Sequence, residues 1–294
     1  GYLNTVNKFQ QTYSIPIERL KDDKIADKLK LVTSPFILRR VKTDKSIIND
    51  LPEKLVFDEY CYLAPSQAAL YESTLSNSMK VIKTSEGIKR LFNILKLITS
   101  LKQICNHPAN YLKNRDLSKD ISGKMLKTIS ILEKILDNNE KCLLFTQYKE
   151  MGDILQVIIE RELSSTPEFF HGSLSRNERE RLITKFQEDE ESKIMILSLK
   201  AGGTGLNLTA ATNVIHYDLW WNPAVENQAT DRTYRIGQSQ NVTVHRLITL
   251  GTFEEKIDEL LKEKNKLVDM SLFTGEKMLT DLSNDEIYDI FTLR

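Results

Sequence analysis

The stretch KIMILSLKAGGTGLNL, residues 193–208, decides the fold because it joins an apolar run to a glycine-rich turn. Lys193–Leu199 is a nearly continuous apolar run of strand length, typical of a strand buried on both faces. The glycines that follow permit positive φ angles and the close approach of another backbone. Lys200, Thr204 and backbone N–H groups in such a turn can hold phosphate, although the segment could also be only a tight turn.

The glycine pattern does not match a dinucleotide-binding fingerprint. Gly203 and Gly205 are followed by Leu208 where that fingerprint needs a third glycine, and a further strand follows instead of a long helix. A nucleotide-dependent oxidoreductase of the doubly wound class is therefore nearly excluded.

On both sides of this stretch, short apolar runs alternate with amphipathic segments. The pattern predicts strands at 142–145, near 169–170, at 193–199, 213–217 and 241–247, and helices at 124–136, 149–163, 176–187 and 224–234. Buried strands that alternate with helices indicate an α/β fold with a parallel sheet covered on both faces. A charged amphipathic helix from Thr252 to about Met270 follows and is expected to close the unit.

The part before this alternation has a mostly helical pattern, from Asn4 to about Asn114. Prolines interrupt it at Ser34-Pro35, Leu51-Pro52 and Ala64-Pro65, because proline restricts the residue before it. Ile88–Ile104 has apolar residues at intervals of three and four, which predicts one apolar stripe on a helix.

Composition limits the class of protein. The chain has 294 residues, with 41 basic and 41 acidic side chains, so any contact with nucleic acid must depend on local charge. No run approaches the roughly 18 apolar residues that a membrane helix needs. The start, Gly1–Asn4, has neither a leader pattern nor an initiator methionine, which favours a fragment of a longer protein.

The cysteines indicate an intracellular, reduced protein. Cys61, Cys105 and Cys142 are scattered singly, without the spacing of a zinc site or of a secreted disulfide framework. Cys105-Asn106-His107 has no partner pair and is followed by Pro108, so a helix end explains it better than a metal site. No metal ligand is predicted on this chain.

The segment QATDRTYRIGQ, residues 228–238, places two arginines three residues apart. On a helix, Arg232 and Arg235 would share one face near the helix end, from which a long cationic side chain can reach across a cleft. A guanidinium group suits a phosphoryl transition state because it is always charged and donates in a planar fork. The spacing alone slightly favours the alternative, a pair of surface salt bridges.

The segment DLWWNP, residues 218–223, contains both tryptophans of the chain. An exposed indole at the carboxyl end of a strand can lie against a sugar or base, but packing is an equal alternative for each ring. Asn222-Pro223 is a natural helix start, with asparagine as the cap and proline in the first turn.

These three segments resemble motifs V and VI of the Swi/Snf family within helicase superfamily two, in the order and spacing of that family. Leu143–Tyr148 resembles motif IV and Phe170–Ser175 resembles motif IVa. Upstream segments resemble the connecting and protrusion segments of the family: Ser34–Arg40, Asp50–Lys54, Leu101–Pro108 and Ser122–Lys124. His171 departs from the aspartate that is common in motif IVa, and we expect a hydrogen-bonded turn residue there rather than a catalytic base.

The resemblance implies a RecA-like fold of the P-loop NTPase type, a second lobe that lacks the Walker A loop. It covers nearly the whole chain and is weakest after about Leu272. The implied organisation is a connecting segment from the first lobe at 1–58, a helical protrusion at 59–120, the helicase C-terminal RecA-like lobe at 121–251 and C-terminal brace helices at 252–294.

Two nucleotide-binding elements are missing from the sequence. Ser122-Gly123-Lys124-Met125 is not a Walker A loop, because Ser118 stands where the first glycine is needed and Met125 replaces the magnesium-binding hydroxyl. No Asp-Glu pair ends an apolar strand. The resemblance implies that ATP and Mg²⁺ are held mainly by a preceding N-terminal RecA-like lobe, and that this chain alone hydrolyses ATP negligibly.

The resemblance also implies a role for each candidate residue. Arg232 and Arg235 are expected to be catalytic arginine fingers, and Gln228, Asp231 and Gly205 to lie on the nucleotide side. The residues expected at double-stranded DNA are Thr146, Gln147, Gly172, Lys200, Gly202, Gly203, Thr204 and Trp221. The implied function is ATP-driven translocation by a monomer along a DNA backbone that is read by charge and shape. A helicase-like module that binds DNA or a partner without ATPase activity stays an alternative.

Overall fold

The computed structural model of the chain describes residues 3, 5–20, 22–33, 52–114, 116–198, 206–220, 222–235, 237–267 and 283–294. The chain divides into two compact units, Gly1–Asn49 and Asp50–Arg294. The described part of the first unit is helical: α1 (Val6–Phe9), a π-helical turn (Gln10–Ser14), α2 (Ile15–Leu20) and α3 (Asp23–Thr33). The helical pattern predicted for this stretch is confirmed there.

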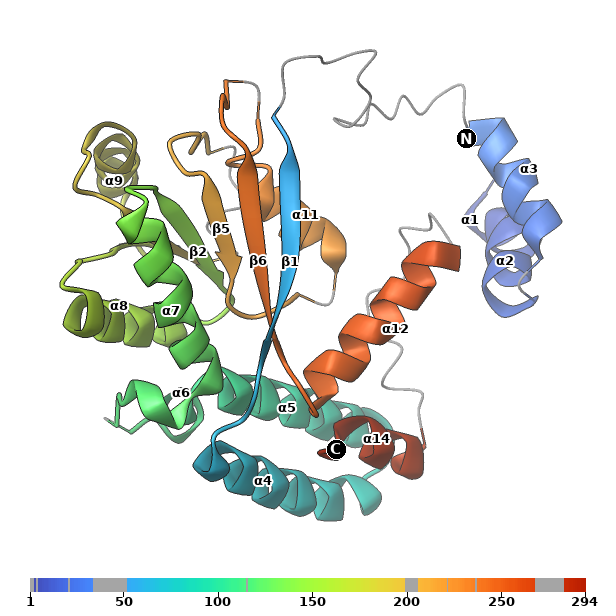
Figure 1. Cartoon of the computed structure of the whole chain (residues 1–294). Coiled ribbons are helices and arrows are strands. Elements are labelled where there is room, and N and C mark those ends of the chain that lie inside the picture. Colours follow the sequence, from blue (N-terminus) through green and yellow to red (C-terminus); the bar gives the residue numbers. More distant parts are fainter. Residues whose placement is uncertain are drawn as a thin grey trace. The chain divides into compact units, whose positions relative to one another are not determined.

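The second unit is built on a six-stranded parallel sheet with the order β1-β6-β5-β2-β4-β3. The neighbours β1, β6, β5 and β2 can be followed in Figure 1. Its strands are β1 (Lys54–Cys61), β2 (Cys142–Thr146), β3 (Glu168–Phe170), β4 (Ile194–Ser198), β5 (Asn213–His216) and β6 (Val242–Thr249). The predicted α/β class with a parallel sheet is confirmed. Of the four inner strands, β2, β4 and β5 are buried at every residue, as expected for strands covered on both faces.

The strand β1 was not predicted, because the sequence pattern indicated helices and connecting segments up to about Asn114. It pairs in parallel with β6, from Lys54 opposite Val242 to Cys61 opposite Thr249. An edge strand needs no continuous apolar run, and the first four residues of β1 are exposed. The sequence KLVFDEYC mixes charged and apolar residues, so its strand character depends on β6, which is nearly 190 residues away in the chain.

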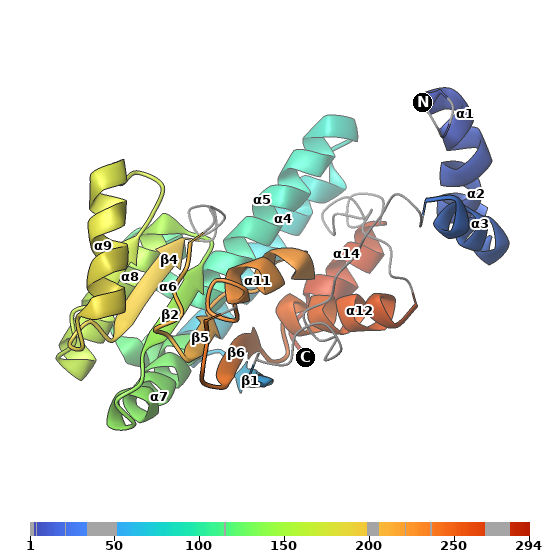
Figure 2. The same cartoon turned by 90° about the horizontal axis from the view of Figure 1, so that it is seen from above.

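Helices cover both faces of the sheet. Two of them, α7 (Gly123–Asp137) and α8 (Lys149–Leu163), share one apolar core with β2, β4 and β5. On the opposite face, α9 (Arg176–Glu188) and α11 (Pro223–Thr230) share a second core with the same strands. In the view from above, α7 and α11 lie on opposite sides of the strands (Figure 2).

A third core joins the predicted protrusion to the C-terminal helices. It is formed by α4 (Pro65–Lys83), α5 (Gly87–Asn106), α12 (Phe253–Leu267) and α14 (Asn284–Phe291). The hydroxyl of Tyr71 in α4 donates to the carbonyl of Phe291 at 2.8 Å. The short elements α6 (Pro108–Leu112) and a 3-10 turn (Lys119–Ile121) lead from α5 back to the sheet. Helices from the beginning and from the end of the unit's sequence therefore pack together in one layer (Figure 1).

Several local predictions are confirmed. Asn222 caps α11 through its side chain, and Pro223 is the first residue of that helix. Asn106 ends α5 and Pro108 begins α6, so the Cys105–Pro108 segment is a helix end. The three cysteines are buried free thiols. No helix among the described residues combines the length and the apolarity that a bilayer crossing requires.

Candidate functional site

The arginine segment follows α11 but is not part of it. The sequence predicted a helix to Tyr234, and this is wrong because α11 ends at Thr230. The next residues form turns in which the N–H of Arg232 donates to the carbonyl of Ala229. Arg232 is buried, with 8% of its surface exposed. Arg235 is exposed, and its Nη1 lies 3.5 Å from the carbonyl oxygen of Leu206.

Backbone and side-chain bonds attach these turns to the stretch after the glycine-rich turn. The N–H of Leu208 donates to the carbonyl of Arg232 at 3.0 Å. The amide nitrogen of Gln238 donates to the carbonyls of Thr209 and Ala211, each at 3.0 Å. The arginine segment therefore lies beside residues 206–211, which follow the glycine-rich turn. In the sequence these are two separate motifs.

The other candidate residues are distributed unevenly. Lys200, Gly202, Gly203, Thr204, Gly205 and Trp221 lie outside the described residues. Gln228 is exposed on α11, and Asp231 is half-buried as its C-cap. Gly172 is exposed in the turn after β3, and its carbonyl accepts from Arg179 at 2.6 Å.

The turn after β3 also contains His171. Its Nδ1 lies 3.3 Å from the N–H of Ser173, as expected for a hydrogen-bonded turn residue. Partial burial and the nearby Lys149 lower the pKa of His171, although Asp153 opposes this effect. Among the described residues there is no group of three His, Cys, Asp or Glu side chains that could hold a metal ion.

Thr146 is the last residue of β2 and Gln147 follows it, and both use their hydrogen-bond donors within the protein. Thr146 is fully buried, and its hydroxyl donates to Oδ2 of Asp218 at 2.6 Å. The N–H of Gln147 donates to Oδ1 of Asp218 at 2.8 Å, and its side-chain amide donates to the carbonyl of Leu219 at 2.8 Å. A direct contact between the Thr146 side chain and DNA does not fit this arrangement, because the hydroxyl is already engaged and covered.

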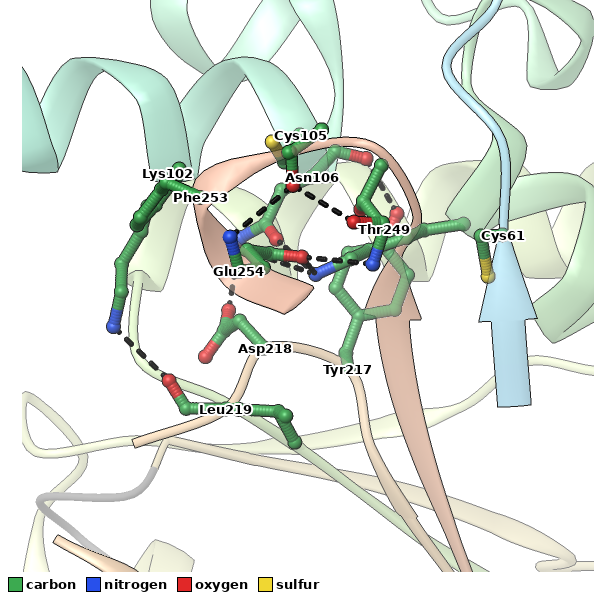
Figure 3. A network of polar contacts seen from close by, with 12 residues as sticks. Cys61, Lys102, Cys105, Asn106, Tyr217, Asp218, Leu219, Thr249, Phe253 and Glu254 are labelled. Carbon is green, nitrogen blue, oxygen red and sulfur yellow. Dashed lines mark hydrogen bonds and ion pairs between the residues drawn. The ribbon is translucent and has the colours of Figure 1, made fainter. Parts of the chain in front are cut away.

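Asp218 is part of a buried polar cluster (Figure 3). Besides the two bonds from the end of β2, its Oδ2 accepts from the amide of Asn106 in α5 at 2.9 Å. Lys102, also in α5, donates to the carbonyl of Leu219 at 3.0 Å. Burial raises the pKa of Asp218, and the hydrogen bond from Thr146 and the charge of Lys124 only partly oppose it.

Lys124, at the start of α7, completes this cluster. It forms an ion pair of 2.9 Å with Glu254 in the first turn of α12, and the two side chains are 0% and 4% exposed. Burial favours the neutral form, but the charge of Glu254 and the hydrogen bond to it, together with Cys105 and Asp218, outweigh burial, so the pKa of Lys124 is raised. This lysine is inside the protein and cannot hold a nucleotide phosphate, which supports the conclusion that Ser122–Met125 is not a Walker A loop.

Sequence reasoning did not find this cluster. Asp218, Asn106 and Lys124 all lie in segments that carry the family resemblance, and that was the only available signal. Asn106 and Asp218 are 112 residues apart in the chain, so no local spacing could have paired them.

Two family descriptions match the chain. Residues 1–110 match the SNF2-related domain, and residues 127–237 match the helicase conserved C-terminal domain. The second range contains β2 to β5, α11 and both candidate arginines.

The chain is similar to segments of much longer proteins. The Bacillus subtilis protein YwqA, whose name assigns it ATP-dependent helicase or translocase activity, is 46% identical over 295 residues, which cover 100% of this chain and 32% of that protein. The DNA excision repair protein ERCC-6 of Homo sapiens is 33% identical over 319 residues, which cover 100% of this chain and 21% of that protein. The chain thus spans about a third or less of the length of these relatives.

Solved structures show the same fold. The Sulfolobus solfataricus SWI2/SNF2 ATPase core in complex with dsDNA is 44% identical, with a TM-score of 0.75, and the match covers 100% of this chain and 62% of that one. The C-terminal domain of the Sulfolobus solfataricus SWI2/SNF2 ATPase is 43% identical, with a TM-score of 0.72, and the match covers 82% of this chain and 100% of that one. This chain therefore belongs to the SWI2/SNF2 family, and its second unit has the fold of the RecA-like C-terminal domain of these ATPases.

Proposed function

We propose that this chain is the second motor lobe of an ATP-dependent double-stranded DNA translocase of the chromatin-remodelling or repair type. The exposed position of Arg235, at the end of the α11 segment and beside Leu206, is the main support for this proposal. A side chain in that position can reach a nucleotide held by another lobe. The similarity to an ATPase core in complex with dsDNA supports DNA as the track.

The two arginines differ in how readily they can serve as fingers. Arg235 can donate its planar fork to phosphate oxygens as charge develops in the transition state. Arg232 is buried, so it would either act after the lobes close or support the turn that presents Arg235. We assign the larger catalytic effect to Arg235.

ATP and Mg²⁺ would be held mainly by the N-terminal RecA-like lobe of the same protein. The sequence of this chain contains no Gly-x-x-x-x-Gly-Lys-[Ser/Thr] loop, and its nearest approach, at Lys124, is a buried ion pair. An arginine finger without a phosphate cradle has no bound substrate to act on. The chain by itself is therefore expected to hydrolyse ATP negligibly.

The DNA-facing residues of this lobe are proposed to be Lys200, Gly202, Gly203, Thr204 and Trp221, with Gly172 on the neighbouring turn. Backbone N–H groups and lysine contact phosphates without reading sequence, as a translocating motor requires. The geometry favours a supporting role for Thr146 and Gln147, since their donors bind Asp218 and Leu219.

The test is Arg235→Ala in the full-length protein, with Arg176→Ala as a matched control. Arg176 is an exposed arginine on α9 that pairs with Glu180 on its own helix. Arg235→Ala should lower DNA-stimulated ATP turnover by about a thousandfold or more, within the range for arginine fingers. The control should stay close to the wild-type rate. Undiminished turnover in Arg235→Ala would remove the finger assignment.

A binding module without ATPase activity is the competing function. It predicts that the full-length protein binds double-stranded DNA but shows no ATP turnover above background at any DNA concentration. The motor proposal predicts turnover that rises with DNA and saturates. Measuring phosphate release during a DNA titration separates the two.

A further inference from the structure

The segment Asp218–Trp220 lies between β5 and α11 in the chain and is fixed at several points. At its first residue, the carboxylate of Asp218 accepts the hydroxyl of Thr146 at 2.6 Å and the N–H of Gln147 at 2.8 Å. Thr146 is the last residue of β2, the strand next to β5 in the sheet, and Gln147 follows it. The segment is thus attached to its neighbouring strand by a side chain, beyond the point where the β2–β5 pairing ends at His216.

The next two residues are attached to other elements. The carbonyl of Leu219 accepts from the amide of Gln147 at 2.8 Å. It also accepts from Lys102 of α5 at 3.0 Å (Figure 3). The N–H of Trp220 donates to Glu226 at 2.8 Å. Because Glu226 lies in the first turn of α11, the segment is tied to the helix that it introduces.

The end of this helix leads directly to the candidate finger. α11 has eight residues, and Arg235 follows five residues after its last residue, Thr230. A short helix with intact backbone bonds moves as a rigid body, so the position of its first turn determines where its other end lies. A shift of Asp218 would therefore be passed to Arg235.

We propose that Asp218 is a positioning residue for ATP hydrolysis: it fixes the segment before α11 to the end of β2 and so places Arg235 for its work on the nucleotide. This inference rests on the proposed motor function, because it needs Arg235 to be a catalytic arginine. Asp218 itself is buried and contacts neither nucleotide nor DNA in this role.

Carboxylate chemistry suits this task better than any other side chain of the same size. Three donors converge on Asp218, from Thr146, Gln147 and Asn106, and an ionised carboxylate has only acceptors to offer them. An asparagine of equal shape would turn one acceptor into a donor. That donor would face the N–H of Gln147 or the two donors at Oδ2, so at least one bond would be lost.

The experiment is a double-mutant cycle on the full-length protein with Asp218→Asn and Arg235→Ala. Alone, Asp218→Asn should lower DNA-stimulated kcat by about tenfold to a hundredfold, since a misplacement of about 1 Å can have that effect. The KM for ATP should change by less than about twofold, because the other lobe holds most of the nucleotide. With Arg235→Ala already present, Asp218→Asn should lower kcat no further, because residues that act through one group are not additive.

A second variant and a control distinguish a loss of positioning from general damage to the fold. Thr146→Val keeps the buried shape but removes the hydroxyl that Asp218 binds, and it should give a smaller loss of kcat, about threefold, with the same non-additivity. Thr128→Val is the matched control. Thr128 is also buried, but its hydroxyl donates at 2.8 Å to the backbone carbonyl of Lys124 in the same helix. The control should not change kcat.

Different failures have different meanings. If Asp218→Asn multiplies the loss of kcat caused by Arg235→Ala, or if neither Asp218→Asn nor Thr146→Val lowers kcat, Asp218 does not act through Arg235 and this inference is overturned while the motor function stands. If Arg235→Ala alone leaves kcat unchanged, the finger assignment of Arg235 fails and this inference fails with it; the motor function itself fails only if the unmodified protein shows no DNA-stimulated turnover. If Asp218→Asn does not fold, Thr146→Val decides by the same criteria.

Discussion

Two charged clusters attach α12 to the rest of the unit, and they are built in opposite ways. The first is the single ion pair between Lys124 and Glu254, fully enclosed beside Asn106 and Asp218. The second surrounds Arg246 of β6, about one turn further along α12. There one arginine contacts three carboxylates, from Asp58, Glu226 and Asp258, which belong to β1, α11 and α12.

In the second cluster, carboxylates form ion pairs with more than one cation, and in the first cluster Glu254 forms an ion pair with Lys124. Lys262 reaches both Asp58 and Asp258 at 2.6 Å, so these two carboxylates keep a cation if Arg246 is lost. Burial alone would favour the neutral form of Arg246, but the carboxylates around it raise its pKa above the usual value. In the first cluster, Glu254 has Lys124 as the only cation in an ion pair with it among the described residues.

This difference teaches where the unit is sensitive. A buried ion pair contributes little compared with a well-packed apolar pair, but removal of one partner leaves a charge that nothing solvates. A partly exposed network loses only a share of its contacts when one member is removed. The clusters also contact different parts of the candidate site: the first lies beside Asp218, and the second includes Glu226 of α11.

The largest effect should come from Lys124→Met. This change leaves Glu254 buried without its cation, and it should lower the free energy of unfolding by about 3–5 kcal/mol. Urea unfolding of the chain, followed by circular dichroism, measures it. The double variant Lys124→Met with Glu254→Leu removes both charges and should recover most of the loss. A double variant as unstable as the single one would mean that shape, and not the unpaired charge, causes the loss.

Arg246→Met should have a smaller effect and lower the free energy of unfolding by about 2 kcal/mol, the contribution of a hydrogen bond to a charged group. Lys262 still forms ion pairs with Asp58 and Asp258, and Glu226 still accepts from the N–H of Trp220. The same urea titration applies. A loss as large as that of Lys124→Met would show that the shared contacts give no protection and would remove the contrast between the clusters.

The sequence predicted most of the sheet because its inner strands carry their own signal. The runs that became β2, β4 and β5 are short and mostly apolar, and α8 was predicted with the same ends that the structure has, Lys149–Leu163. The edge strand β1 has no such pattern. It could not be predicted without knowing that it pairs with β6.

The candidate site was predictable in its parts but not in its connections. The resemblance supplied Arg232 and Arg235, yet the helix was extended past Thr230 and both side chains were expected to share a face. Arg232 is buried, and its carbonyl accepts from the N–H of Leu208, 24 residues earlier in the chain; local spacing reveals neither fact. The role of Asp218 depends on donors that are 71 to 112 residues away in the chain.

Acid should affect the second cluster through Asp58. Partial burial would raise the pKa of Asp58, but hydrogen bonds and charges from Lys262 and Arg246 outweigh it, so the pKa lies below its usual value. A carboxylate with a depressed pKa stabilises the folded state above its unfolded pKa, which is about 3.9, and this stabilisation is lost as the pH falls through the folded pKa. The free energy of unfolding, measured from pH 6 down to about pH 3, should therefore fall less steeply in Asp58→Asn than in the wild type. Parallel curves would contradict this assignment.

The smallest effect is expected for Lys262→Ala, at the exposed rim of the second cluster. The side chain of Lys262 is 45% exposed, and Arg246 remains in contact with both of its carboxylate partners. Its removal should lower the free energy of unfolding by no more than about 1 kcal/mol. The loss should shrink further in about 1 M salt, because exposed charges are screened there and the enclosed pair of Lys124 and Glu254 is screened much less. Urea titrations of Lys262→Ala and Lys124→Met at low and high salt test this directly: if salt reduced both losses in the same proportion, burial would not be what separates the two clusters.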